Sequence, residues 1–196
     1  MKEDMKKNIY EILNEKKVLI SETQKSDYAE KVEAAVDIMV EELKLGNKII
    51  LAGNGGSAAD AQHFAGEIVG RFLFDRPSAP AISLCTDSSV MTCIANDYGY
   101  DEVFARQIEG LGKEGDTFIA ISTSGNSANI ISAIKVAKEK KIHVIGLLGN
   151  DGGAIRDMCD VAIVIHSDST PRIQEFHTFT VHMICQFIER KLFSEA

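Results

Sequence analysis

The sequence is 196 residues long and 45% hydrophobic, which is enough to form a buried core within one domain. Its formal net charge of −8 excludes a broad nucleic-acid-binding surface, because such a surface needs clustered Lys and Arg side chains to neutralise phosphates. The sequence contains no run of about 18 apolar residues, so we expect no membrane-spanning helix and no membrane partner.

The N-terminal residues and the cysteines indicate a cellular compartment. Residues 1–17 are charged throughout and lack the apolar stretch of a signal peptide. The four cysteines are scattered, without a CxxC pair or a spacing typical of metal ligands. Scattered cysteines of this kind are usually reduced thiols of a reducing compartment. We therefore expect a cytoplasmic protein.

Residues 1–45 predict two amphipathic helices. The second has apolar residues at helical spacing between charged ones. These apolar residues are Val32, Val36, Met39, Val40 and Leu43. Gly46 ends this helix, as a residue that readily adopts a positive φ commonly does. The first helix, from about residue 3 to residue 20, has apolar positions that a compact domain does not readily cover, so we expect residues 1–45 to contribute to contacts in a homo-oligomer.

Short apolar runs follow, separated by glycine-rich turns and helical stretches. The predicted strands are 48–52, 80–84, 117–122, 143–148 and 161–165, and a last helix is predicted at 172–193. Runs that are apolar on both faces and alternate with helices are typical of a parallel sheet covered on both sides. The fold class is therefore α/β, a three-layer αβα sandwich with a mostly parallel sheet of about five strands and N-terminal helices. We predict a single domain over residues 1–196.

The first predicted strand runs into a glycine-rich loop, Gly53-Asn54-Gly55-Gly56-Ser57, and a helix follows directly. In parallel sheets, ligands bind beyond the carboxyl ends of the strands, where the free N–H groups of helix N-termini attract anions. We expect Ser57 to cap the helix and to offer a hydroxyl. The loop lacks the Gly-Lys-Ser/Thr of a nucleotide-binding P-loop and the spacing of a dinucleotide fingerprint, so we expect no nucleotide cofactor. By itself, such a turn often serves only chain geometry.

The third predicted strand ends in a second polar loop, Ser122-Thr123-Ser124-Gly125-Asn126-Ser127. Hydroxyl and backbone N–H groups can bind phosphate without a lysine. One hydroxyl is expected to cap the next helix, but four are more than a cap needs. Because the two loops end strands of one parallel sheet, we expect them to meet at the same edge and form an anion site.

These two loops resemble the sugar isomerase (SIS) domain, a phosphosugar-binding α/β sandwich. The resemblance runs from about residue 48 to the C-terminus and is strongest to the phosphoheptose isomerases. The shared segments are GNGGSAADAQHFAGE, Arg76–Pro77, Ala95–Asp97, ISTSGNSAN, Gly149–Gly153 with its GxDGG pattern, and RIQE with a histidine after it. This resemblance implies ketose–aldose isomerisation of sedoheptulose 7-phosphate to D-glycero-D-manno-heptose 7-phosphate, for the heptose of lipopolysaccharide or another surface polysaccharide. It also implies a homotetramer with sites shared between subunits.

Two helices carry groups that suit proton transfer. His63 and Glu67 are four residues apart and lie on one helix face, and Gln174 and His182 can reach a common site across about two turns. Isomerisation through an enediol needs a base near one carbon and an acid near the next. On spacing alone, the His63–Glu67 pair is more often solvated, and a histidine in an apolar helix is more often packed in a core. We interpret His143, His166 and His177 as structural.

The resemblance assigns roles to individual residues. It implies that Glu67 abstracts the proton and that His182 serves the other carbon. The residues it implies for phosphate binding are Ser57, Ser122, Ser124 and Ser127, together with the backbone of Gly55 and Gly56, which directly precede Ser57. Those implied for the sugar are Asn54, Asp97, Thr123 and Gln174, with Arg71 near the site. Some phosphoheptose isomerases carry zinc at positions matching His63, Glu67, Gln174 and His182, and zinc accepts His and carboxylate ligands readily.

Two other functions compete with isomerisation. A non-catalytic SIS protein that binds the replication initiator DnaA shares the GNGGSAA start and the RIQE segment, but such members lack the Glu and the terminal His that are Glu67 and His182 here. Phosphosugar-sensing regulators usually carry an attached DNA-binding domain. The first 45 residues are too short, and too acidic to neutral in charge, for a helix-turn-helix with a linker. We therefore expect a small-molecule phosphosugar as the ligand and no nucleic acid.

Overall fold

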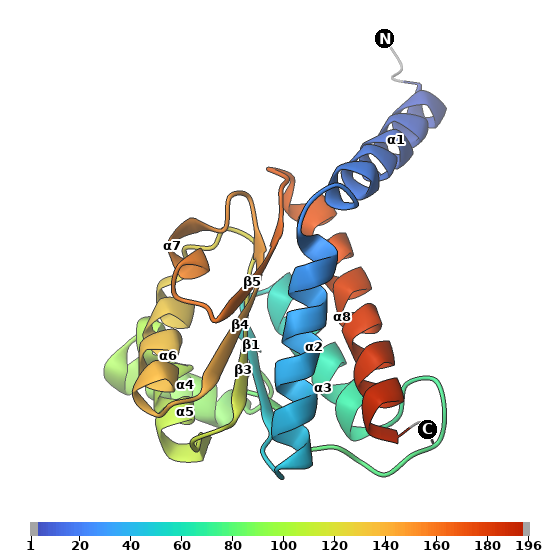
Figure 1. The fold of residues 1–196 in the computed structure, drawn as a ribbon. Coiled ribbons are helices and arrows are strands. Elements are labelled where there is room, and N and C mark those ends of the chain that lie inside the picture. The colour runs from blue at the N-terminus through green and yellow to red at the C-terminus, as the bar shows by residue number, and fades with distance from the viewer. Residues whose placement is uncertain (1–3, 194–196) are drawn as a thin grey trace.

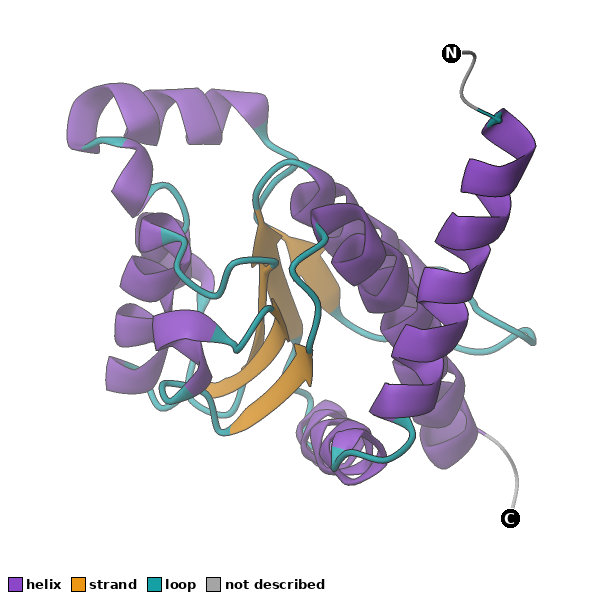
Figure 2. Cartoon of the chain, turned by 90° about the horizontal axis from the view of Figure 1, so that it is seen from above, coloured by secondary structure: helices purple, strands orange, loops and turns teal. Residues whose placement is uncertain are grey.

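The computed structural model describes residues 4–193 and shows a central sheet with helices on both faces (Figure 1, Figure 2). The strands are β1 (Ile49–Gly53), β2 (Ala81–Ser83), β3 (Thr117–Ser122), β4 (His143–Gly149) and β5 (Val161–Ile165). Their order is β2-β1-β3-β4-β5, and every neighbouring pair is parallel. The predicted three-layer α/β sandwich is confirmed. Residues 1–3 and 194–196 of the predicted domain lie outside the described residues.

Alternate strand side chains enter two separate cores, which explains why the strands read as continuous apolar runs. Ile49 and Leu51 of β1 face one core, and Ile50 and Ala52 face the other. The first core is closed by α2 (Tyr28–Lys44), α3 (Gly56–Val69) and α8 (Thr170–Phe193). The second core is closed by α4 (Ser88–Tyr98), α5 (Ala105–Leu111), α6 (Ala128–Glu139) and α7 (Gly153–Arg156). Val103 and Phe104, which follow the short η1 (Tyr100–Glu102), also belong to it.

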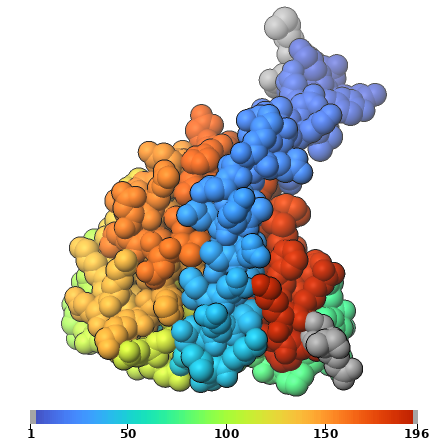
Figure 3. Space-filling model, viewed as in Figure 1, coloured from blue at the N-terminus to red at the C-terminus, as the bar shows by residue number. Residues whose placement is uncertain are grey.

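The two N-terminal helices predicted over residues 1–45 are confirmed as α1 (Met5–Thr23) and α2. Gly46 follows the end of α2 with a φ of +80°, as its role in ending the helix requires. Helix α1 has no buried residue and projects beyond the sandwich (Figure 1, Figure 3). No helix within residues 4–193 is long and apolar enough to cross a membrane.

Candidate active site

The site lies at the carboxyl edge of the sheet, where the neighbouring parallel strands β1 and β3 both end. After β1, Gly55 adopts a positive φ of 56° and takes the N-cap position of α3. The prediction that Ser57 caps this helix is wrong, because the glycine turn starts α3 at Gly56 and places Ser57 in its first turn. There Ser57 is 3% exposed, and its N–H donates to the Asn54 carbonyl at 3.0 Å.

Three serine hydroxyls gather in the loop after β3. Ser122 Oγ lies 3.0 Å from Ser127 Oγ and 3.5 Å from Ser124 Oγ, and it accepts a hydrogen bond from the Gly125 N–H at 3.1 Å. Ser127 stands at the N-cap of α6, but its side chain makes no capping bond, contrary to the expectation that one hydroxyl caps this helix. The hydroxyls and the N-terminus of α6 are thus directed at one small region, as a phosphate would require.

A glycine fixes the shape of this loop. Gly125 has a φ of +66°, and a Cβ on it would lie 2.0 Å from the Gly152 carbonyl oxygen. The N–H of Ile155 also donates to the Gly125 carbonyl at 3.0 Å. The loop after β3 therefore packs against the Gly149–Gly153 loop after β4, which gives the GxDGG segment a structural role.

An amide pair joins the two loops. Asn54 and Asn129 each donate from Nδ2 to the other's Oδ1 at 2.9 Å, and Asn129 is only 3% exposed. The Tyr100 hydroxyl also donates to Asn54 Oδ1 at 3.1 Å. This arrangement fixes the orientation of Asn54 at the sheet edge.

The groups suited to proton transfer meet between α3 and α8. His63 Nε2 lies 2.8 Å from His182 Nε2 and 3.5 Å from Glu67 Oε1. The ring of Phe72 covers His182, with centroids 5.6 Å apart. One ligand atom from each of His63, Glu67 and His182 lies within 4.8 Å of the others. The cluster therefore offers two imidazole nitrogens and a carboxylate oxygen to one point, a set of groups that suits both metal binding and acid–base chemistry.

Further polar groups connect α8 to α3 near this cluster. The Gln174 side chain lies against Gly56, where a Cβ would come within 2.3 Å of its Nε2. The Thr178 hydroxyl donates to Asp60 Oδ1 at 2.8 Å, and Asp60 Oδ2 is buried with no hydrogen-bond partner among the described residues. Burial raises the pKa of Asp60, while the Thr178 hydrogen bond and the nearby His63 oppose that rise.

The remaining predicted residues lie apart from these contacts. Arg71 is exposed just after α3, and Asp97 is exposed near the end of α4, where it accepts a hydrogen bond from the Asn96 side chain at 2.7 Å. Neither side chain hydrogen-bonds to the histidine cluster or the serine loop within residues 4–193. The Thr123 carbonyl accepts from Asn150 Nδ2 at 2.9 Å. The roles of all these residues stay predictions.

His177 has the structural place expected for it. It is fully buried, and its Nε2 donates to the Leu148 carbonyl of β4 at 3.1 Å. Burial lowers its pKa from 6.5 to about 4, so the ring is neutral at pH 7. This bond fixes α8 on the sheet, one residue before Thr178.

Sequence reasoning gave no role to several residues that shape the site. Asn129 and Arg76 lie inside the segments that carry the family resemblance, and only that resemblance could have pointed to them. Glu189 is a charged residue on the apolar face of the last helix, where an unpaired charge would be costly. Phe72 and Tyr100 gave no signal, because the sequence does not show which loop meets which helix.

Comparisons with known proteins agree with this geometry. The family model described as "SIS domain" matches residues 13–149. The phosphoheptose isomerase of Sulfurimonas denitrificans is 56% identical over 165 residues, which cover 84% of this chain and 85% of the relative. The solved phosphoheptose isomerase of Neisseria gonorrhoeae has a TM-score of 0.89 and 41% identity, covering 94% of this chain and 98% of its own. That of Francisella tularensis has a TM-score of 0.92 and 34% identity, covering 96% and 100%.

The chain therefore belongs to the SIS-domain family and, within it, to the phosphoheptose isomerases, which are phosphosugar isomerases. It is an enzyme of this class. The initiator-binding and regulatory alternatives find no support in these relatives.

Proposed function

We propose that the chain isomerises sedoheptulose 7-phosphate to D-glycero-D-manno-heptose 7-phosphate through an enediol. The observation that carries this proposal is the meeting of Glu67 and His182, from two helices, in one cluster of a chain that also presents grouped serine hydroxyls after β3. The heptose substrate is inferred from the names of the relatives, and the proton-transfer chemistry is inferred from the residues of the site.

The residues divide between binding and proton transfer. Ser122, Ser124 and Ser127 hold the phosphate with hydroxyl and backbone N–H groups, and Ser57 with the Gly55–Gly56 backbone contributes from the neighbouring loop. Asn54, Asp97, Thr123 and Gln174 contact the sugar hydroxyls, and Arg71 lies near the open side. A phosphate held in this way anchors one end of the sugar and leaves the carbonyl end to the helices.

Proton transfer is the task of two side chains. Glu67 removes a proton from the carbon next to the carbonyl, and His182 donates a proton to the carbonyl oxygen, which gives the enediol. The other enediol hydroxyl then loses its proton as a proton is delivered to the former carbonyl carbon, so the aldose forms with no net gain or loss of protons. A carboxylate and an imidazole on opposite helices can act on neighbouring carbons of one substrate without moving. The Phe72 ring packs against the His182 ring, with centroids 5.6 Å apart.

The residues present also fit a zinc ion. Two imidazole nitrogens and a carboxylate oxygen within 4.8 Å of one another form a donor set that zinc accepts. His63, Glu67 and His182 would hold it, with Gln174 as a fourth and less usual ligand. When bound, the ion would polarise substrate oxygens as a Lewis acid.

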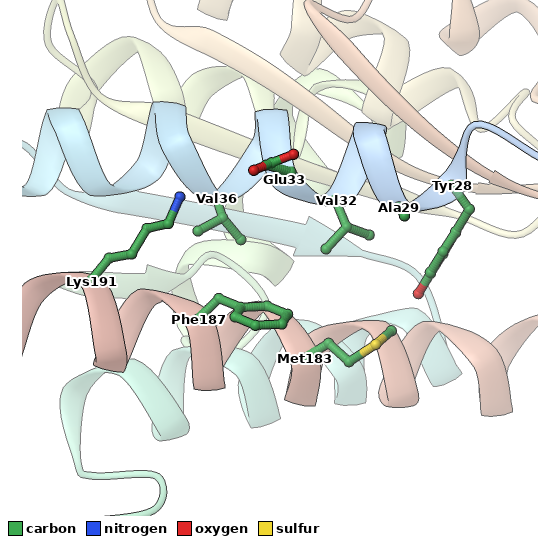
Figure 4. A pocket seen from close by; sticks show the side chains of 8 residues that line it. All are labelled: Tyr28, Ala29, Val32, Glu33, Val36, Met183, Phe187 and Lys191. Carbon is green, nitrogen blue, oxygen red and sulfur yellow. The ribbon is translucent and has the colours of Figure 1, made fainter. Parts of the chain in front are cut away.

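We further propose that the chain forms a homotetramer through α1 and the helices beside it. The apolar side chains of Ile9, Leu13 and Val18 on α1 are 51%, 56% and 60% exposed. A groove between α2 and α8 is lined mainly by apolar side chains (Figure 4). Its lining residues are Tyr28, Ala29, Val32, Glu33, Val36, Met183, Phe187 and Lys191. Other copies of this chain would cover both surfaces, because the apolar side chains of α1 and the apolar groove between α2 and α8 would each be removed from water.

The cellular role follows from the product. An aldoheptose phosphate is a precursor of the activated heptose used for lipopolysaccharide or another surface polysaccharide, and such a pathway begins in the cytoplasm. The four free cysteines, Cys85, Cys93, Cys159 and Cys185, are in keeping with a reducing compartment.

The function is tested by incubating the protein with sedoheptulose 7-phosphate and following the aldose product by NMR, with fructose 6-phosphate as the shorter comparison. We expect conversion of the heptulose and much slower conversion of the hexulose. No turnover of any phosphosugar, with or without added Zn²⁺, would refute the proposal. Light scattering at micromolar concentration tests the assembly, and a monomeric mass would refute it.

A further inference from the structure

A buried ion pair lies beyond the histidine cluster, where α3 ends. Arg76, in the segment between α3 and β2, donates from Nε to Glu189 Oε1 of α8 at 3.0 Å. The two side chains are only 3% and 1% exposed. Because burying two charges costs much of what their attraction gains, such a pair is weak evidence for stability alone. Its position next to the site suggests another purpose.

The guanidinium of Arg76 holds the end of α3. Its Nη2 donates to the Glu67 carbonyl at 2.8 Å, and its Nη1 donates to the Ile68 carbonyl at 3.0 Å. Carbonyls in the last turn of a helix have no partner within the helix, and these bonds satisfy two of them. The Ile68 carbonyl also accepts from the Ala79 N–H at 3.4 Å. Arg76 thereby fixes the backbone of the residue that carries the proposed base.

The carboxylate of Glu189 holds the loop after α3. It accepts from the Phe72 N–H at 2.9 Å and from the Leu73 N–H at 2.7 Å. Burial raises the pKa of Glu189, but these hydrogen bonds and the charge of Arg76 outweigh it and hold that pKa below its usual range. The anchored loop carries Phe72, whose ring lies over His182 at a tilt of 32°.

We propose that Arg76 and Glu189 are positioning residues for the isomerisation, fixing Glu67 through its carbonyl and His182 through the Phe72 ring. This role rests on the proposed function. One buried pair then reaches both proton-transfer groups without touching the substrate. Displacements of about 1 Å at a reacting group can cost about a hundredfold in rate, so a constraint on the relative position of α3 and α8 has a direct effect on turnover.

The test compares kcat and KM for Glu189→Gln and Arg76→Lys with those of Asp116→Asn. Asp116 is a matched control, because it is fully buried, accepts two backbone N–H bonds, from Lys48 and Lys113, and pairs with the Lys48 ammonium. It lies before β3, at the amino edge of the sheet and away from the site. All variants are assayed at a temperature where circular dichroism shows them folded.

We expect Glu189→Gln and Arg76→Lys to lower kcat at least about tenfold with KM changed less than about threefold, while Asp116→Asn keeps both within about twofold. Phe72→Leu, which keeps the backbone N–H and removes the ring, should lower kcat several-fold. If Glu189→Gln does not fold, Arg76→Lys and Phe72→Leu decide the matter. If the wild-type protein is active and these folded variants keep its kcat, the positioning role is overturned while the proposed function stands. The same holds if Asp116→Asn loses as much kcat as they do. A wild-type protein without turnover would overturn the proposed function and this role with it.

Discussion

Replacing His177 with glutamine should remove a large part of the pH dependence of stability. In the folded chain, burial lowers the pKa of His177 from 6.5 to about 4, so the folded state stays neutral at this ring where the unfolded chain takes up a proton. The unfolded state therefore binds more protons between pH 6.5 and pH 4, and the free energy of unfolding falls as the pH falls through this window. At about 1.4 kcal/mol per pKa unit, the full effect is about 3 kcal/mol.

The measurement is urea unfolding at several pH values between 7 and 4, at a fixed protomer concentration because assembly contributes to stability. Glutamine keeps an N–H that can reach the Leu148 carbonyl but does not titrate, so the difference between wild type and His177→Gln isolates this group. The wild-type protein should lose about 3 kcal/mol more than the variant over this range. Equal pH slopes in the two proteins would show that His177 does not take up a proton on unfolding in this range.

Three further outcomes follow from the site. Ser124→Ala should raise KM more than it lowers kcat in steady-state assays, because phosphate is bound alike in the ground and transition states; an unchanged KM would place the phosphate elsewhere. Gly125→Ala should destabilise the fold by about 1–3 kcal/mol in urea unfolding, because its Cβ would meet the Gly152 carbonyl at a positive φ. Gly110→Ala, inside α5 and with no atom within 4 Å of the new Cβ, should not destabilise it and should stabilise it by up to about 1 kcal/mol. Removal of metal by a chelator should lower turnover and Zn²⁺ should restore it, and full activity at a zinc content near zero would exclude the metal.

The sheet could be predicted because its strands are apolar on both faces. Ile49 and Leu51 pack against α2, α3 and α8, while Ile50 packs against the helices on the opposite face. The run between Lys48 and Gly53 is therefore apolar on both faces, which is typical of a buried parallel strand. The meeting of the two loops was predictable for the same reason, since parallel strands end at one edge. The cap of α3 was not, because the glycines allow a turn in which Gly55, rather than Ser57, precedes the helix.

Contacts distant in sequence could not be predicted from local pattern. Arg76 and Glu189 are 113 positions apart, and Asn54 and Asn129 are 75 apart. Each pair depends on how two helices or loops pack in the tertiary structure, and helix spacing specifies only which face a residue occupies. The pairing of His63 with His182 was within reach only because a family resemblance placed both at one site.

The turnover of Glu67→Gln on sedoheptulose 7-phosphate is the most direct test of the proposed proton transfer. Glutamine keeps the size and hydrogen-bonding capacity of Glu67 but cannot accept the proton. General-base catalysis contributes about 10²–10⁴-fold, so kcat should fall by at least that order, while substrate binding, measured by calorimetry, persists. Turnover close to that of the wild-type protein would mean that a group other than Glu67 is the base.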